Sequence, residues 1–153
     1  MVKNKTGTLA SLAEKIGCIA GGMPLEEAEN FGNIAANIGI GFQIIDDVIN
    51  LTTGNVGKKR GDDIVEGKKS LPVVIHTAIN PQDKEKIAEY MQKASEEGID
   101  SPAVEECISL LESSECITTA AKEGSGLIAD NCALLQSEKI FKLFTSMIPQ
   151  AFK

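Results

Sequence analysis

Two adjacent carboxylates, Asp46 and Asp47, lie inside the apolar segment FQIIDDVIN of residues 42–50. Burying a carboxylate without a partner is unfavourable, so an acid pair in such a segment requires a cation nearby. Aspartate oxygens are ligands that suit a hard divalent ion, and Mg²⁺ in particular takes oxygen ligands and retains some of its water. The acid pair therefore raises the possibility of a divalent cation site.

A strongly basic segment follows directly. Residues 53–69, TGNVGKKRGDDIVEGKK, hold five basic residues and four glycines in a chain of net charge −7. Glycine lets a backbone turn sharply or approach a ligand closely. Lysines beside carboxylates on consecutive elements indicate phosphate oxygens that are bridged to the protein by Mg²⁺ and held by ammonium groups. The alternative is a solvated surface loop whose charges bind nothing.

Helices are expected to position both segments, because no run alternates with the period of a strand. Proline and glycine mark several of the joints. The predicted helices cover 8–20, 24–52, 71–79, 81–97, 102–111, 115–135 and 138–147, with 53–69 irregular. The prediction is a single all-α domain over residues 1–153.

The helix predicted over 24–52 has one face almost without side-chain volume. At 100° per residue, Gln43, Asp46, Asp47 and Asn50 fall within an arc of about 100°. The same arc contains small residues towards the N-terminus: Ala28, Gly32, Ala35, Ala36 and Gly39. Such a stripe either allows close contact between helices or lines a cavity, and the helix alone does not separate these readings.

Composition narrows the class of protein. The acidic balance argues against a nucleic-acid surface, which would need a basic face. The four cysteines show no CxxC spacing, which favours reduced, buried thiols. The first residues contain no uninterrupted apolar stretch, so we expect neither a signal peptide nor a stable membrane anchor, and a cytoplasmic location. His76, the only histidine, is expected to pack within its helix rather than act as a base.

Three ordered segments carry a resemblance. KTG at residues 5–7, GFQIIDDVIN at 41–50 and GKKRGDDIVEGKKSLP at 57–72 resemble successive motifs of the trans-type polyprenyl diphosphate synthases, which include the geranylgeranyl and farnesyl diphosphate synthases. The resemblance implies an isoprenoid-synthase helical bundle. It also implies a prenyltransferase that joins an allylic diphosphate to isopentenyl diphosphate, head to tail, with Mg²⁺ as cofactor.

The resemblance also implies roles for particular residues. The metal would be held by Asp46, Asp47 and Asn50, with Asp46 as the most direct ligand. The diphosphate would be bound by Lys5, Thr6, Gln43, Lys58 and Lys68. Asp46 and Lys5 would be the catalytic residues, and Asp63 matches a further acid of the family. Metal and lysine charge would stabilise the leaving diphosphate, and an apolar space would protect the allylic cation from water.

The sequence departs from the family in two respects. Asn50 stands where the motif has a third acid. The first aspartate-rich DDxxD motif and the isopentenyl diphosphate site before it have no counterpart, so the chain corresponds to the C-terminal half of the bundle. We expect a hetero- or homo-oligomer in which another chain supplies that motif, and apolar faces of the long helix left uncovered. The alternatives are a non-catalytic regulatory or stabilising subunit of a complete synthase, or an inactive truncated fragment.

Overall fold

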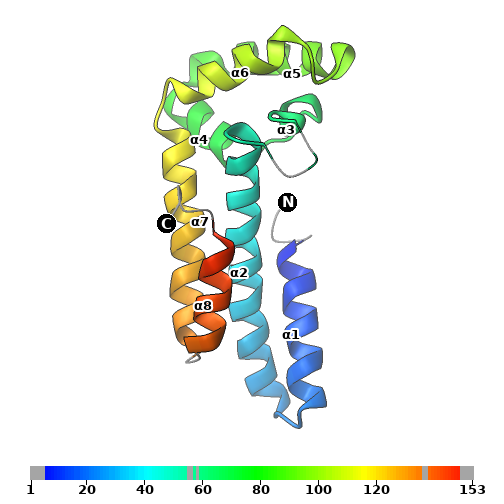
Figure 1. Ribbon diagram of the computed structural model, residues 1–153, viewed down its shortest axis with the longest axis vertical. Coiled ribbons are helices and arrows are strands. Elements are labelled where there is room, and N and C mark those ends of the chain that lie inside the picture. Colours follow the sequence, from blue (N-terminus) through cyan, green and yellow to red (C-terminus); the bar gives the residue numbers. More distant parts are fainter. Residues whose placement is uncertain (1–5, 55–56, 58, 136–137, 149–153) are drawn as a thin grey trace. The chain divides into compact units, whose positions relative to one another are not determined.

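The computed structural model describes residues 6–54, 57, 59–135 and 138–148 (Figure 1). Within these residues the chain forms α-helices and one short 3₁₀-helix, with no strand. The helices are α1 (Thr8–Ala20), α2 (Leu25–Leu51), α3 (Asp62–Val65), α4 (Leu71–Ile79), η2 (Pro81–Asp83), α5 (Lys84–Glu97), α6 (Pro102–Glu112), α7 (Cys116–Leu134) and α8 (Glu138–Met147). The predicted all-α class is confirmed.

The predicted bounds agree closely with the observed ones, and two details differ. The segment 53–69, expected to be irregular, contains the four-residue helix α3. The helix expected over 81–97 begins as the 3₁₀ turn η2 and continues as α5. Pro81 stands at the start of this 3₁₀ turn, where its missing amide hydrogen leaves no helical hydrogen bond unmade.

The chain divides into two compact units. The first comprises residues 1–45 and 122–153, and the second comprises residues 46–121. The first unit contains α1, α8 and the larger parts of α2 and α7. The second contains the C-terminal turns of α2, the helices α3 to α6 and the start of α7.

The core of the second unit is aliphatic. It is formed by side chains that are at most 5% exposed: Leu51, Ile64, Val73, Ile87, Ala94, Val104, Cys107, Ile108, Leu111 and Cys116. Gly61 brings the segment before α3 against α6: its φ is 91°, and a Cβ there would overlap Val104. Only glycine meets both requirements without strain.

His76 is fully buried in the second unit. Its Nδ1 lies 2.9 Å from Ser114 Oγ and its Nε2 lies 3.1 Å from Asp83 Oδ2. Both ring nitrogens therefore have partners, which a buried imidazole needs. The histidine joins α4 to η2 and to the turn between α6 and α7, in agreement with the expected packing role.

Two glycines allow close contact between α2 and α7 in the first unit. A Cβ on Gly41 would lie 2.7 Å from the carbonyl oxygen of Gly124, and one on Gly124 would lie 3.0 Å from that of Gly41. Nearby, Asn37 Nδ2 donates to Asn131 Oδ1 at 3.0 Å. This pair gives Asn37 a structural role in the contact between α2 and α7.

Helix α2 is long and apolar enough to span a membrane by length and composition, with a mean hydropathy of 1.3 over its best window and half of that window buried. A core helix of a soluble protein passes the same test. Because α2 packs closely against α7 and buries Ile38, Ile44 and Ile45, we interpret it as a core helix.

The cysteines are free thiols: Cys107, Cys116 and Cys132 are buried and Cys18 is partly exposed. Burial raises the pKa of the Cys107 thiol to about 11. Such a thiol is a poor nucleophile near neutral pH.

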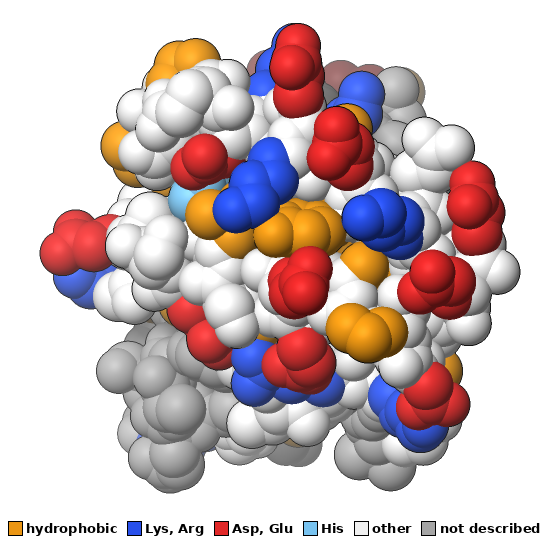
Figure 2. All heavy atoms as spheres, turned by 90° about the horizontal axis from the view of Figure 1, so that it is seen from above, with side chains coloured by type: hydrophobic (Ala, Val, Ile, Leu, Met, Phe, Trp, Pro, Cys, Tyr) orange, Lys and Arg blue, Asp and Glu red, His pale blue; other side chains and the backbone are white. Residues whose placement is uncertain are grey.

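On the face drawn in Figure 2, Lys and Arg side chains alternate with Asp and Glu, and hydrophobic side chains are exposed between them. That face is therefore not a basic surface.

Candidate functional site

One ammonium group joins two buried carboxylates in the second unit. Lys68 Nζ lies 2.7 Å from Asp47 Oδ1 and 2.8 Å from Asp63 Oδ2. The side chain of Asp47 is 1% exposed, that of Asp63 is 9% exposed and that of Lys68 is 29% exposed. The basic segment thus supplies a cation to the buried acid of α2.

Asn50 holds this arrangement in place through the backbone. Its Oδ1 accepts a hydrogen bond from the backbone N–H of Asp63 at 3.1 Å, and its carbonyl oxygen accepts one from Gly61 at 2.9 Å. The backbone N–H of Lys68 in turn donates to the carbonyl oxygen of Asp63 at 2.9 Å. These bonds fix α3 and the residues after it against the end of α2.

The cluster formed by Asp47, Asp63 and Lys68 shifts the pKa values of Asp63 and Lys68. Burial disfavours the charged form of Lys68, but the hydrogen bonds and charges of Asp47 and Asp63 outweigh it, so the pKa of Lys68 is raised. Burial also raises the pKa of the Asp63 carboxyl, and Lys68 offsets this only in part. The ammonium therefore remains protonated throughout the physiological range.

Asp46 has a different environment from its neighbour. It is exposed, whereas Asp47 is buried, because successive residues of a helix point about 100° apart. Among the described residues, no group of three His, Cys, Asp or Glu side chains is arranged to hold a metal ion. Mg²⁺ usually binds through one or two carboxylates together with substrate phosphates and water. The donor set here, with Asp46 exposed and Asp47 bonded to Lys68, fits an ion bridged to a phosphate ligand better than an all-protein site.

Two bases of the segment 53–69 bind acids of the second unit instead of remaining available for a ligand. Lys59 Nζ lies 2.6 Å from Asp100 Oδ1, and both of these side chains are exposed. Arg60 Nη2 lies 2.9 Å from Glu112 Oε1 and 3.6 Å from Glu105 Oε2, and its Nη1 donates to the carbonyl oxygen of Thr52 at 3.3 Å. The sequence did not reveal these partners, because they lie 41 to 52 residues further along the chain.

Of the remaining predicted diphosphate ligands, two meet in the first unit. Thr6 Oγ1 donates to Gln43 Oε1 at 2.9 Å, so Thr6 is adjacent to α2 there. The predicted ligands Lys5 and Lys58 lie outside the described residues. The structure thus forms two groups: Asp47, Asn50 and Lys68 in the second unit, and Thr6 with Gln43 in the first.

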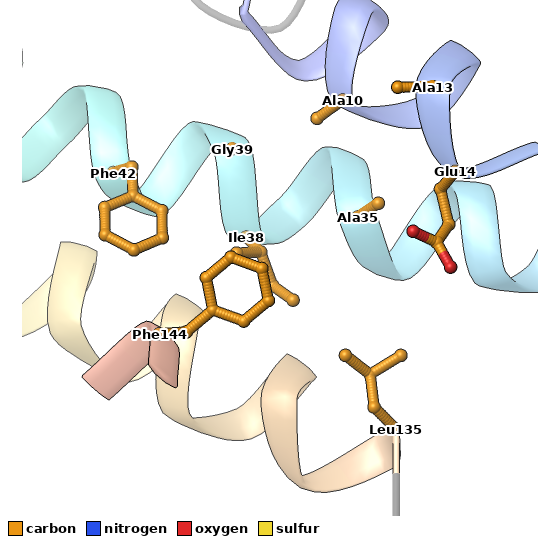
Figure 3. Close-up of a pocket in the computed structure, with 9 residues that line it drawn as sticks. All are labelled: Ala10, Ala13, Glu14, Ala35, Ile38, Gly39, Phe42, Leu135 and Phe144. Atoms are coloured by element: carbon orange, nitrogen blue, oxygen red, sulfur yellow. The ribbon is translucent and has the colours of Figure 1, made fainter. Parts of the chain in front are cut away.

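The small-residue stripe of α2 serves both purposes that the sequence left open. A Cβ on Gly39 would lie 3.1 Å from the Cβ of Ala10, so this part of the stripe brings α1 close. Further along, the stripe lines a cavity of about 310 Å³ in the first unit. The lining residues, shown in Figure 3, are Ala10, Ala13, Glu14, Ala35, Ile38, Gly39, Phe42, Leu135 and Phe144.

Aromatic rings form one wall of this cavity. The centroids of Phe42 and Phe144 are 5.8 Å apart and their planes are inclined at 50°, so α8 contributes a ring to the same space as α2 (Figure 3). Glu14 is the single charged residue among those that line the cavity. A volume of this size with mostly apolar walls suits a hydrocarbon group.

The chain is thus all-α, with adjacent carboxylates on a long helix and a lysine-rich segment that returns to one of them. A family model described as polyprenyl synthetase matches residues 1–111. The chain therefore belongs to the polyprenyl synthetase family.

Curated relatives agree with this membership. Geranylgeranyl pyrophosphate synthase 2 of Zymoseptoria tritici is 38% identical over 115 residues, which cover 73% of this chain and 33% of that protein. Geranylgeranyl diphosphate synthase of Methanosarcina mazei is 45% identical over 76 residues, which cover 48% of this chain and 24% of that protein. The chain matches about a third or less of the length of these relatives.

A solved structure extends the similarity to the fold. The geranylgeranyl pyrophosphate synthetase of Pyrococcus horikoshii matches 97% of this chain with a TM-score of 0.76 and 29% sequence identity. The match covers 46% of that chain. The predicted assignment to part of the isoprenoid-synthase bundle is thereby confirmed, and the chain represents a little less than half of the fold.

Proposed function

We propose that the chain binds an allylic diphosphate through Mg²⁺ and takes part in its head-to-tail condensation with isopentenyl diphosphate, as a trans-prenyltransferase that needs another chain for the first aspartate-rich motif. Family membership supports the reaction class. The observation that carries the site is the position of Lys68, whose ammonium lies within hydrogen-bond distance of Asp47 on α2. Carboxylate and ammonium thus lie together, as a Mg²⁺–diphosphate ligand requires.

In this proposal each residue has a separate task. Asp46, which is exposed, would ligate the ion, while Asp47 and Asn50 keep Lys68 and α3 in position beside it. Lys68 would donate to a diphosphate oxygen, and Lys5 and Lys58 would complete the basic surroundings. When bound, Mg²⁺ would supply charge that stabilises the diphosphate as a leaving group.

The cavity of the first unit supports the second half of the proposal. Its apolar lining would accept a hydrocarbon group and limit the access of water to it. Gln43, hydrogen-bonded to Thr6 in the same unit, would bind a polar group of the substrate. The cytoplasmic location and the oligomeric state expected from the sequence belong to the same proposal.

A second candidate function is favoured by a specific observation. Asp47 is bonded to Lys68, and the amide oxygen of Asn50 is bonded to the backbone of Asp63. Both residues therefore have structural tasks without any ligand. This is what a non-catalytic subunit would retain if it stabilised or regulated a complete synthase, and a partner that is fully active alone would favour this candidate.

The proposal is tested by ligand-dependent stability. Thermal unfolding is followed with and without Mg²⁺ and inorganic pyrophosphate, for the wild type and for Asp46→Asn. Binding at a hundredfold excess over Kd stabilises a protein by about 2.7 kcal/mol, which corresponds to a rise in Tm of about 5–10 °C for a chain of this length. We expect this rise in the wild type and its loss in Asp46→Asn.

The matched control is Asp62→Asn, which removes a partly exposed acid from α3 in the same unit. It should keep the full rise in Tm. An unchanged Tm of the wild type at millimolar Mg²⁺ and pyrophosphate, or an equal rise in Asp46→Asn, would contradict the proposed site.

A further inference from the structure

A second cavity of the first unit lies between α1 and α2 and has a volume of about 270 Å³. Four of its lining residues carry polar side chains: Thr8, Ser11, Lys15 and Asn33. No residue lines both this cavity and the apolar one of Figure 3. Thr6 and Gln43, which were predicted to bind diphosphate, do not line it. The polar cavity is therefore separate from the features used so far.

The polar side chains of this cavity can all donate hydrogen bonds. Thr8, Ser11 and Lys15 follow one another by three and four residues, so they share one face of α1, and Asn33 comes from α2. An ammonium group has three donors, and hydroxyl and amide groups donate as well. No carboxylate is among the described residues that line the cavity, although the chain has 22 acidic and 15 basic residues. Such a lining suits a negatively charged ligand with several acceptor oxygens.

Gly32 of α2 gives Lys15 a defined position. A Cβ on Gly32 would lie 2.5 Å from Cε and 2.6 Å from Cγ of Lys15, and 3.0 Å from Ser11 Oγ. The alkyl stem of Lys15 therefore lies across bare backbone, and the side chain is partly buried. Because the stem is already packed without a ligand, binding orders it at a smaller cost in conformational entropy.

The charge of Lys15 is not used within the described part of the chain, where no acidic group lies within ion-pair distance of it. Lys59, Arg60 and Lys68, by contrast, are each bound to an acid. The neighbouring Glu14 lines the apolar cavity instead (Figure 3). The Lys15 ammonium can thus bind an anion without first breaking an ion pair.

We propose that the polar cavity between α1 and α2 binds a phosphate group. Lys15 supplies the opposite charge, and the hydroxyls of Thr8 and Ser11 and the amide of Asn33 donate to the phosphate oxygens. Because no carboxylate lines the cavity to hold Mg²⁺, the site takes the metal-free anion. It goes beyond the proposed function, whose ligand is a Mg²⁺–diphosphate complex at Asp46, and neither site depends on the other.

The test is a calorimetric titration of the chain with inorganic phosphate, in EDTA and at neutral pH. We expect binding by the wild type and an affinity at least about tenfold lower in Lys15→Met, which loses a charge-assisted hydrogen bond. Lys122→Met is the matched control, because it removes the same charge from an exposed position of α7 in the same unit. It should leave the affinity unchanged. No binding at millimolar phosphate, or equal losses in the two variants, would overturn the proposal.

A second pair of variants keeps the proposal testable if Lys15→Met does not fold. Gly32→Ala retains every charge but displaces the stem of Lys15, so we expect weaker phosphate binding. Gly17→Ala adds the same methyl group on α1 at a position with no atom within 4 Å, and binding should be unchanged. Equal affinities of Gly32→Ala and the wild type would contradict the position assigned to Lys15.

Two further measurements identify the source of the phosphate group and separate the two sites. Sedimentation with vesicles that contain phosphatidic acid is compared with the phosphate titration. Binding of free phosphate alone indicates a soluble ligand, and vesicle binding that Lys15→Met abolishes indicates a lipid headgroup at the same site. Asp46→Asn should bind metal-free phosphate like the wild type. Loss of that binding in Asp46→Asn would overturn the separate cavity site, whereas a missing rise in Tm with Mg²⁺ and pyrophosphate contradicts only the proposed function.

Discussion

Lys68 Nζ lies 2.7 Å from Oδ1 of Asp47, a carboxylate whose side chain is 1% exposed. The cation required by the acid in the apolar segment is thus supplied by the chain itself, 21 residues further on. Without any bound ligand, this pair explains why the chain tolerates Asp47 in a buried position. It also makes Lys68 the residue on which the shape of the candidate site depends.

Replacing Lys68 by methionine should destabilise the fold. Lys68→Met keeps the length of the side chain but leaves Asp47 and Asp63 buried without their cation. We expect a loss of about 2–3 kcal/mol in the free energy of unfolding, measured by urea denaturation. Lys69→Met, at an exposed neighbouring position, should stay within about 0.5 kcal/mol of the wild type. Equal effects of the two variants would contradict a structural role of the pair.

The stabilisation by Lys68 should disappear at high pH. Its pKa in the folded state is raised above the usual 10.5, since the two carboxylates outweigh burial. A raised lysine pKa contributes stability that is complete below pH 10.5 and is lost as the pH rises through the folded-state pKa. The difference in unfolding free energy between the wild type and Lys68→Met should therefore be constant from neutral pH to pH 10.5 and shrink above it. A difference that grows with pH would show the opposite sign of the shift.

Restoring the third acid of the motif should cost stability in the absence of ligand. Asn50 is 2% exposed and lies next to the acids of the cluster, so Asn50→Asp adds a buried like charge. We expect a loss of about 2–4 kcal/mol in the free energy of unfolding at neutral pH, part of which returns with Mg²⁺ and pyrophosphate. The control Asn33→Asp adds the same charge at an exposed position of α2 and should change little. No recovery with ligand would show that a carboxylate introduced at position 50 does not reach the ion.

Adding one methyl group at Gly41 should disturb the contact between α2 and α7. A Cβ there would lie 2.7 Å from the carbonyl oxygen of Gly124 and 2.7 Å from Ile128 Cγ1. Gly41→Ala should lower the free energy of unfolding by about 1–3 kcal/mol, because two helices would have to separate. Gly126→Ala provides the contrast: no atom lies within 4 Å of its Cβ position, so helix propensity alone should stabilise α7 by up to about 1 kcal/mol. Chemical denaturation of the two variants checks the difference in sign.

Most of the helical framework could be predicted from the sequence, because glycine and proline punctuate it. Gly21 follows α1, Pro72 and Pro102 stand at the starts of α4 and α6, and Gly98 ends α5. These residues act through local backbone geometry, which a sequence shows directly. The short helix α3 escaped prediction because four residues are too few to show a helical period.

The candidate site could be predicted only in part. Of the residues that the motifs indicated, the structure brings Lys68 to Asp47 and Thr6 to Gln43. Charge counting could not show that Lys59 and Arg60 have acidic partners on or near α6, because those contacts depend on the tertiary fold. The helical periodicity likewise placed Asp46 and Asp47 in one arc of the helix surface, although only Asp47 is buried. Which of two adjacent acids lies inward depends on what covers the helix.

The single histidine of the chain can serve as a probe of local unfolding. His76 is fully buried and held at both ring nitrogens, so an acylating reagent such as diethyl pyrocarbonate cannot reach it while residues 46–121 remain folded. Its modification rate would therefore report the opening of this unit alone, without any introduced label. Comparing that rate with the global unfolding rate would show whether the two units unfold together or in succession.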